Sequence, residues 1–363
     1  MRRGLVRLGV LLAALAGLGA AAPPPGVDLD LVLADAPAPR LSDYRLFLDA
    51  GADRPNGRVT PYDLATPLFT DHAEKSRFVF TPPGRRIGYT PAGVLDFPVG
   101  AVLVKTFAYP GDLRRPDRQV RKVETRLLIH KASGWTAQTY VWNAEGTEAV
   151  LKRAGARLPV RFTDLEGREG ALDYAVPNQN QCKTCHQLDG AVTPIGPKAR
   201  NLNHEASLAG GGRGNLLALW SRAGLLEGAP APEATPRLAA WNDAAQPLDA
   251  RARAYLDVNC GHCHNPSGSA SNSGLFLTAE ETRPPALGVG KPPVAAGRGS
   301  GDLAVAIDPG HPERSILAFR MASGEPGVMM PELGRALVHE EGVELVHAWI
   351  TAMKPGRETA PGH

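Results

Sequence analysis

Two pentapeptides contain all four cysteines of this 363-residue chain: Cys182–His186 reads CKTCH, and Cys260–His264 reads CGHCH. Cys-x-x-Cys-His is the attachment pattern of c-type haem. Two thiols one helical turn apart reach the two vinyl groups of one porphyrin, and the next imidazole becomes the proximal iron ligand. The pattern therefore predicts two covalently attached haems c. The residues are Cys182, Cys185 and His186 in the first motif and Cys260, Cys263 and His264 in the second.

Paired cysteines also occur in two other settings. Four thiolates can hold one structural zinc, and two pairs can form two disulfides in an exported protein. Neither arrangement needs a histidine directly after each pair. The chain has 10 histidines, so a chance histidine at both places has odds of roughly one in a thousand. The haem interpretation is therefore preferred.

The sixth iron ligand decides what each haem does, because a filled position favours electron transfer and an empty one admits small molecules. For the second haem the expected ligand is Met330, which directly precedes Pro331. Met329 is the close alternative, and Met321 is a weaker one. A thioether stabilises ferrous iron and raises the potential relative to a second histidine.

For the first haem, His204 is the only histidine between the two motifs, and no methionine lies there. It is the candidate distal ligand, and with His186 it would make a bis-histidine centre of lower potential. The alternatives are a surface histidine at 204, a ligand from another part of the chain, or an open position. His262 fills a variable position of the second motif and is expected to be exposed.

Residues 40–176 contain no cysteine and are predicted to form a β-rich domain of unknown role. Residues 94–107 resemble two strands around a Pro/Gly turn. Residues 124–131 and 135–143, joined by Ala-Ser-Gly, predict a hairpin. His72 and His130 are expected to be structural rather than ligands.

Two haem units are expected to follow, the first at 177–247 and the second at 248–355. A helix beginning near Asp249 should lead into Cys260, and a last helix should cover about 337–353. The expected fold class is α+β multidomain, with the β-rich N-terminal domain followed by two mainly α-helical cytochrome c-like haem domains.

The first 22 residues have the pattern of a secretory signal peptide, with an arginine-containing start, an apolar stretch and small residues before a cleavage point. No later apolar run is long enough to span a membrane. Removing Arg2, Arg3 and Arg7 changes the formal charge from +3 to 0, and no basic stripe suggests nucleic-acid binding. Since haem c is attached outside the cytoplasmic membrane, a bacterial periplasm is the expected location.

Residues 249–353 resemble planctomycete-type cytochrome c domains. The matching stretches are YLDVNCGHCHNPSG, PGHPERSIL, the Met330-Pro331 turn and AWI near the end. More broadly, residues 41–353 resemble a family of bacterial dihaem c-type cytochromes. Here the matching stretches are TPYDLATPLFTDHAEKSRFVF, DFPVGAVLVKTF, PNQNQCKTCH, IGPKARNLN and VMMPELGRALVHEEGV.

This resemblance implies haem binding and electron transfer, with no substrate specified. The expected function is electron transfer between a periplasmic donor and the respiratory chain. The expected partners are redox proteins, either a dehydrogenase or other cytochromes. The main alternative is a dihaem peroxidase or another haem oxidoreductase with an open first haem, and a third is a binding module built on the β-rich domain.

Overall fold

The computed structural model describes residues 26–207, 212–295 and 297–354. The signal peptide predicted for residues 1–22 lies outside these ranges. No helix among the described residues is both long and apolar enough to cross a membrane.

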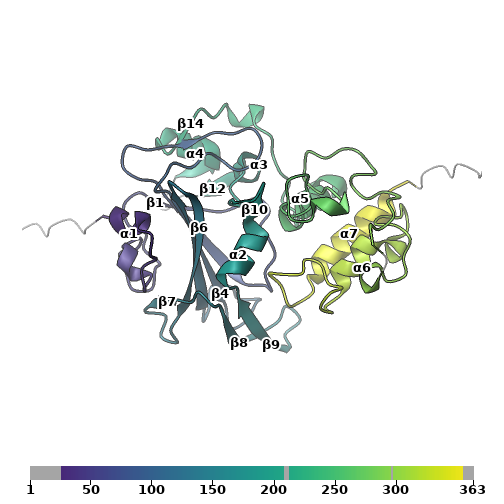
Figure 1. The fold of residues 1–363 in the computed structure, drawn as a ribbon, viewed down its shortest axis with the longest axis horizontal. Coiled ribbons are helices and arrows are strands. Elements are labelled where there is room, and N and C mark those ends of the chain that lie inside the picture. Colours follow the sequence, from purple (N-terminus) through teal and green to yellow (C-terminus); the bar gives the residue numbers. More distant parts are fainter. Residues whose placement is uncertain (1–25, 208–211, 296, 355–363) are drawn as a thin grey trace, which may run out of the picture.

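A six-stranded antiparallel sheet forms the centre of the N-terminal half (Figure 1), with strand order β1-β2-β4-β5-β6-β7. The strands are β1 (Val59–Tyr62), β2 (Glu74–Phe80), β4 (Val102–Tyr109), β5 (Arg121–Lys131), β6 (Gly134–Trp142) and β7 (Ala149–Leu151). The remaining strands form four two-stranded pairs. These are β3 (Ile87–Gly88) with β14 (Leu226–Glu227), β8 (Ala156–Thr163) with β9 (Glu169–Val176), β10 (Gln187–Leu188) with β11 (Ala191–Val192), and β12 (Glu205–Ser207) with β13 (Arg213–Asn215).

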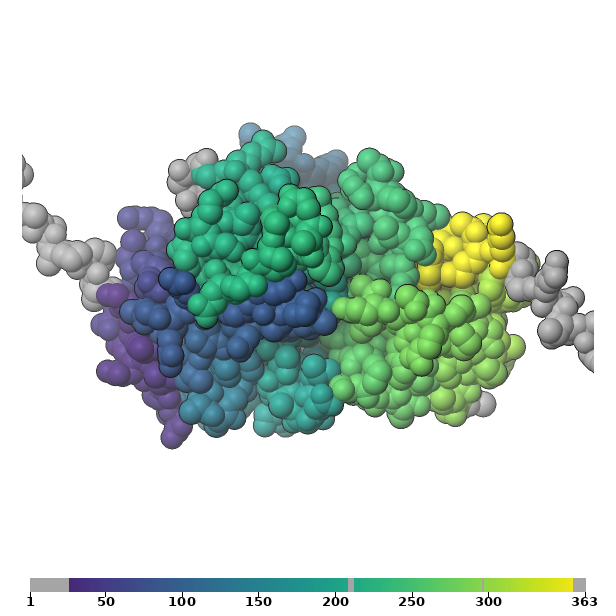
Figure 2. Space-filling view, turned by 90° about the horizontal axis from the view of Figure 1, so that it is seen from above, coloured from purple at the N-terminus to yellow at the C-terminus, as the bar shows by residue number. Residues whose placement is uncertain are grey.

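The described residues form seven α-helices, most of them short. They are α1 (Leu29–Leu33), α2 (Gln179–His186), α3 (Ala199–Leu202), α4 (Leu216–Arg222), α5 (Leu248–Asn259), α6 (Ile316–Ala322) and α7 (Glu340–Ala352). Single 3-10 turns cover Ser42–Tyr44, Pro232–Ala234, Ser271–Ser273, Arg298–Ser300 and Pro312–Arg314. Seen from above, the teal-green segment that contains α4 lies against the blue N-terminal residues, and the yellow-green to yellow C-terminal residues lie beside them (Figure 2).

Alternation along the strands gives the sheet two different faces. One face packs on the N-terminal segment and α1 through residues such as Phe80, Val104 and Tyr140. The other face carries two apolar clusters. One joins Leu103 to α3 and α4, and the other joins Phe107 to β8 and β9.

The expectation of two mainly helical haem domains is wrong. Helical residues make up 22% of the part of the chain that the structure describes, which is β-rich around the six-stranded sheet. In the segment after the first motif, α3 and α4 have four and seven residues, and they bury Leu202 and Trp220 in one apolar cluster with residues of the sheet. Between Cys260 and Ser315 the described chain forms no α-helix, because glycine and proline recur there and interrupt helices.

Several local predictions are confirmed. β5 and β6 form the expected hairpin, closed at Lys131 and Gly134, where Gly134 takes a φ of +106°. The predicted terminal helices correspond to α5 and α7, which pack in one apolar cluster. His130 is half-buried, with Nδ1 2.7 Å from the Phe97 carbonyl oxygen, and His72 lies in a turn.

One predicted strand is wrong. The stretch before β4 makes only isolated bridges, from Val94 to Lys198 and from Asp96 to Gly88. Pro98 has no N–H to donate to a strand ladder. Gly100 takes a φ of +90°, and the Ala101 N–H donates back to the Pro98 carbonyl at 3.0 Å. The predicted Pro/Gly turn is therefore present, but the stretch before it forms no strand.

Candidate functional site

The first motif lies on α2, whose start is fixed by a capping box. The Gln181 N–H donates to the Asn178 side chain and the Asn178 N–H donates to the Gln181 side chain, both at 2.9 Å. Residues three apart on a helix share a face, so Cys182 and Cys185 point the same way. His186 is the last residue of the helix.

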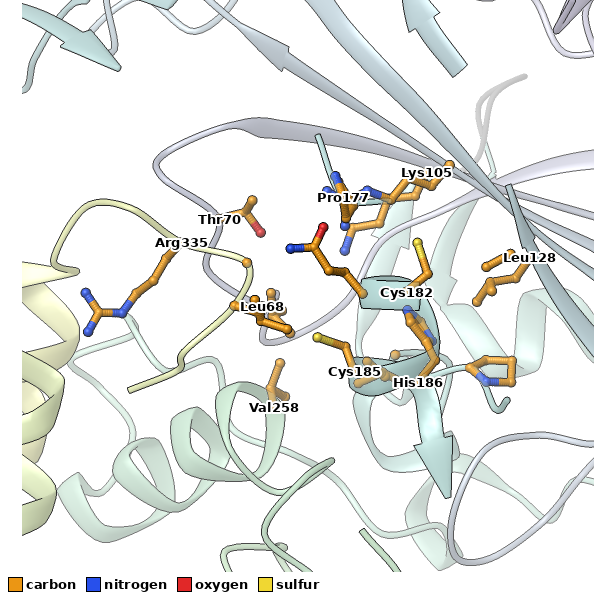
Figure 3. Close-up of a pocket in the computed structure, with 18 of the residues that line it drawn as sticks. Leu68, Thr70, Lys105, Leu128, Pro177, Cys182, Cys185, His186, Val258 and Arg335 are labelled. Atoms are coloured by element: carbon orange, nitrogen blue, oxygen red, sulfur yellow. The ribbon is translucent and has the colours of Figure 1, made fainter. Parts of the chain in front are cut away.

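These three side chains line a cavity of about 670 Å³ between α2, the sheet and the segment that follows α6 (Figure 3). Pockets for cofactors have volumes of about 300–1,000 Å³. The sheet wall contributes Lys105 and Arg126, and the opposite wall contributes Arg335. The cavity therefore has the size and the thiol and imidazole donors that a c-type haem needs.

The hydrogen bond of His186 fixes its tautomer. Its Nδ1 lies 2.9 Å from the Thr193 carbonyl oxygen, which can only accept, so Nδ1 carries the proton and Nε2 keeps its lone pair. Burial lowers the pKa of His186 to about 4, so the ring is neutral at pH 7. A neutral imidazole whose other nitrogen bonds a backbone carbonyl is the form that binds metals.

The four cysteines are free thiols in the structure. Burial raises the pKa of the Cys185 thiol to about 11 and that of Cys260 to about 12. Among the described residues, no group of three or more His, Cys, Asp or Glu side chains is placed to hold a metal ion. The described chain thus presents neither a disulfide nor a four-cysteine zinc site.

The second motif follows α5 and continues as turns. His264 is buried, and its Nδ1 lies 3.2 Å from the Ser273 hydroxyl oxygen. That hydroxyl donates its own hydrogen to the Ala270 carbonyl at 2.7 Å, so its oxygen accepts from His264. As in the first motif, Nδ1 is the donor and Nε2 keeps its lone pair.

A second cavity of about 90 Å³ lies between the motifs. Cys260 and Met330 line it together with Cys185 and His186, whereas His264 is not among its lining residues. Its volume is below the range of ligand pockets. The donor groups of the second motif therefore match a haem, but the cavity beside Cys260 does not have the size of one.

The three candidate methionines occupy different places. Met330 lines the second cavity with Cys260, and Met321 lines it from within the apolar core around α7. Met329 instead lines the first cavity. The structure thus brings Met330, the expected ligand, to the cavity that contains a thiol of the second motif.

Asp71 holds the segment that follows Met330. This buried carboxylate accepts the backbone N–H groups of Ala336 and Leu337 at 2.8 and 2.7 Å. Burial raises its pKa, although these hydrogen bonds oppose the shift. Asp71 was missed at the sequence level because its partners lie more than 260 residues away.

His204 is not brought together with His186. Its Nδ1 lies 3.0 Å from the Glu205 carbonyl oxygen, and its Nε2 lies 3.3 Å from an Asp63 carboxylate oxygen. It lines neither cavity. His262 is half-buried rather than exposed and lines the second cavity, where burial lowers its pKa to about 4.

The charged side chains on the sheet wall were also missed. Lys105 lies between Leu103 and Phe107 on one face of β4, where the alternation predicts an apolar residue. Its burial and the neighbouring cations lower its pKa well below the ordinary lysine value. A lysine at an inward position of a strand is the signal that could have identified this wall.

Comparisons with known proteins found no match to this chain among family models, curated proteins or solved structures.

Proposed function

We propose that this protein is a periplasmic dihaem c-type cytochrome that transfers electrons between a periplasmic donor and the respiratory chain. Cys182 and Cys185 would hold the first haem with His186 as proximal ligand. Cys260 and Cys263 would hold the second, with His264 and Met330 as its two ligands. The partners would be other redox proteins, a dehydrogenase or further cytochromes.

The observation that carries this proposal is the matched state of the two proximal histidines. Each follows its cysteine pair directly, and each donates Nδ1–H to an oxygen, of Thr193 or of Ser273. Such a hydrogen bond sets the tautomer, orients the ring and strengthens Nε2 as a ligand. His130 and His204 also bond a backbone carbonyl through Nδ1, so the weight lies in the position of His186 and His264, each directly after a thiol pair.

Bound haem would supply an iron that takes up and releases one electron. The chain's own contribution is placement. Cys185 and His186 of the first motif line the second cavity together with Cys260, so the two attachment sites are neighbours. Two haems held there would be neighbours, so an electron taken up by one could pass to the other.

A second candidate is a haem oxidoreductase that uses the first site. The lining of the first cavity contains His186 and no other histidine, which favours a first iron without a second imidazole ligand. An accessible iron with charged groups nearby is what peroxidase-like chemistry needs.

A redox titration of the purified protein tests the proposal against this alternative. A carrier takes up two electrons per chain reversibly, and its reduced spectrum changes little when carbon monoxide is added. A large carbon monoxide response from one haem, together with turnover of peroxide, would support the oxidoreductase instead. Absence of any reversible redox change would contradict both.

A further inference from the structure

Three cations lie side by side across the sheet wall of the first cavity. The strand register pairs Arg77 of β2 with Lys105 of β4, and Lys105 with Arg126 of β5. Directly paired residues of antiparallel strands project from the same face. All three line the cavity, and Lys105 is seen in Figure 3 on the sheet side of the space next to α2. We call them the cation row.

Apolar side chains flank the cation row on the same face of the sheet, although Lys75 and Glu124 pair with Phe107 in the next row. On one side of it Val79 and Leu103 belong to the cluster with α3 and α4. On the other side Phe107 and Val141 belong to the cluster with β8 and β9. Like charges directly opposite each other destabilise a sheet, so a row of three needs a compensating partner.

Among the described residues, one of the three cations has a carboxylate partner. Arg126 donates to the buried Glu124 carboxylate at 2.5 and 3.1 Å, and this carboxylate also accepts from the Tyr174 hydroxyl at 2.5 Å. Lys105 makes no ion pair among the described residues, and its Nζ lies over the Phe107 ring at 4.9 Å. The row therefore keeps an excess of positive charge.

Arg77 is the cation of the row that has a buried N–H group without an acceptor. It is 8% exposed, and its Nη1 donates to the Lys75 carbonyl at 3.1 Å. Its Nη2 is buried and has no hydrogen-bond partner within the described chain. A buried guanidinium N–H without an acceptor costs the full desolvation penalty of the group.

The carboxylates that line the same cavity interact with groups other than the cation row. Asp71 accepts two backbone N–H groups, and Asp257 pairs with Arg200 at 2.7 Å. Glu332 is largely exposed and lies 3.6 Å from Arg320. None of them forms an ion pair with the cation row.

We propose that Arg77, Lys105 and Arg126 bind an oxyanion group, a carboxylate or a small inorganic oxyanion, in the first cavity. Guanidinium groups bind planar and tetrahedral oxyanions through two parallel N–H donors, and a lysine adds a point charge. An anion here would also favour the charged form of Lys105, which burial now opposes.

Two sources could supply this group. A free oxyanion would be a substrate or effector of the first site, and its binding does not depend on haem. A propionate carboxylate of the first haem is the other source, and that version rests on the proposed function. The experiment below separates the two.

Isothermal titration calorimetry of the mature protein measures anion binding, and the haem content of each sample is determined separately. The probes are sodium nitrite and sodium sulfate, and sodium chloride at matched ionic strength is the control salt. The variants are Arg77→Gln and Lys105→Met, and the control is Arg157→Gln, a cavity-lining cation whose side chain is 70% exposed and already pairs with Asp173. Lys105→Met keeps the side-chain volume and removes an unpaired charge. It is therefore expected to fold even if Arg77→Gln does not.

For a free oxyanion, wild type binds one nitrite or sulfate per chain, and each cation-row variant weakens binding by about tenfold or more, as expected for loss of a charge-assisted hydrogen bond. The anion affinity of the control Arg157→Gln stays within about twofold of the wild-type affinity, because the ion pair of Arg157 is exposed. Binding by a chain that carries no haem would support this source while contradicting the proposed function.

For a propionate, neither probe binds, and both cation-row variants shift the midpoint potential of one haem while Arg157→Gln does not. The proposal is overturned if the variants match wild type in both anion affinity and midpoint potentials. Anion binding that neither cation-row variant weakens would also overturn it, because the anion would then bind elsewhere.

Discussion

The two Cys-x-x-Cys-His motifs share a pattern and differ in nearly everything around it. The first lies on a capped helix and faces a cavity of about 670 Å³ whose sheet wall carries the cation row. The second follows α5, is packed among helices α5, α6 and α7, and shares a cavity of about 90 Å³ with Met330. In both, the histidine Nδ1 donates to an oxygen.

The motifs and their surroundings carry different information. Under the proposed function, the five-residue motif would determine attachment and the proximal ligand in the same way at both sites. The surroundings would determine what else can approach each iron: charged side chains at the first site and a thioether at the second. The proposed chemistry of the two centres should therefore differ although their motifs do not.

The largest expected effect comes from the buried ion pair that joins the two regions. Arg200 of α3 donates to Asp257 of α5 at 2.7 and 3.2 Å, and the Asp257 side chain is 1% exposed. Asp257→Asn removes the buried counter-charge of Arg200 and Lys198 and leaves Arg200 only the half-exposed Glu280, so it should lower the free energy of unfolding by about 3 kcal/mol. Chemical denaturation measures this change.

The matched control is Asp173→Asn. Its partner Arg157 and Asp173 itself are 70% and 66% exposed, so this change should cost less than about 1 kcal/mol. Equal losses in the two variants would show that the buried pair does not hold the regions together.

The same pair predicts a dependence on pH. Burial alone would raise the pKa of Asp257, but Lys198 and Arg200 outweigh it and hold the pKa below its ordinary value. A carboxyl with a depressed pKa contributes stability above its unfolded pKa of about 3.9, and this is lost as pH falls through the folded pKa. The stability difference between wild type and Asp257→Asn should therefore narrow below about pH 4. A difference that stays constant down to acid pH would refute this.

The next effect distinguishes the two methionines. Met330→Ala should lower the midpoint potential of one haem by on the order of 100 mV, a fraction of the range that axial ligands span, and remove the weak sulfur-to-iron absorption band of the oxidised protein. Met329→Ala is the control, since Met329 lines the other cavity. If Met329→Ala moves the band and Met330→Ala does not, the ligand is Met329.

The smallest effect is expected at His204. Its ring contacts Glu205 and Asp63 and lines neither cavity. His204→Ala should therefore leave the absorption spectra of both haems unchanged. A changed spectrum would identify His204 as the distal ligand of the first haem.

The features predicted correctly from sequence are those encoded in neighbouring residues. The β5–β6 hairpin depends on alternation and a short turn, and α5 and α7 depend on apolar spacing. The expected helical unit around the first motif failed for a physical reason. Leu202 and Trp220 lie in short helices that bury them against the sheet, so the surroundings of this motif depend on strands 100 residues earlier.

The cation row is a second feature that neighbouring residues in the sequence do not encode. Arg77, Lys105 and Arg126 come from three strands, and only the register of those strands brings them together. Taken one at a time, Arg77 and Arg126 look like ordinary surface residues, and Lys105 alone stands at a strand position where the alternation predicts an apolar residue. The functional residues that the sequence revealed are those of the contiguous motifs, whereas the walls that face them required the structure.

The central claim is that each motif holds one haem covalently. Mass spectrometry of the denatured protein, for wild type and for the variants Cys182→Ala/Cys185→Ala and Cys260→Ala/Cys263→Ala, tests it most directly. We predict a mass increase of two haems for wild type and of one haem for each variant. A wild-type chain that carries no covalent haem, or a variant that keeps both, would contradict the account.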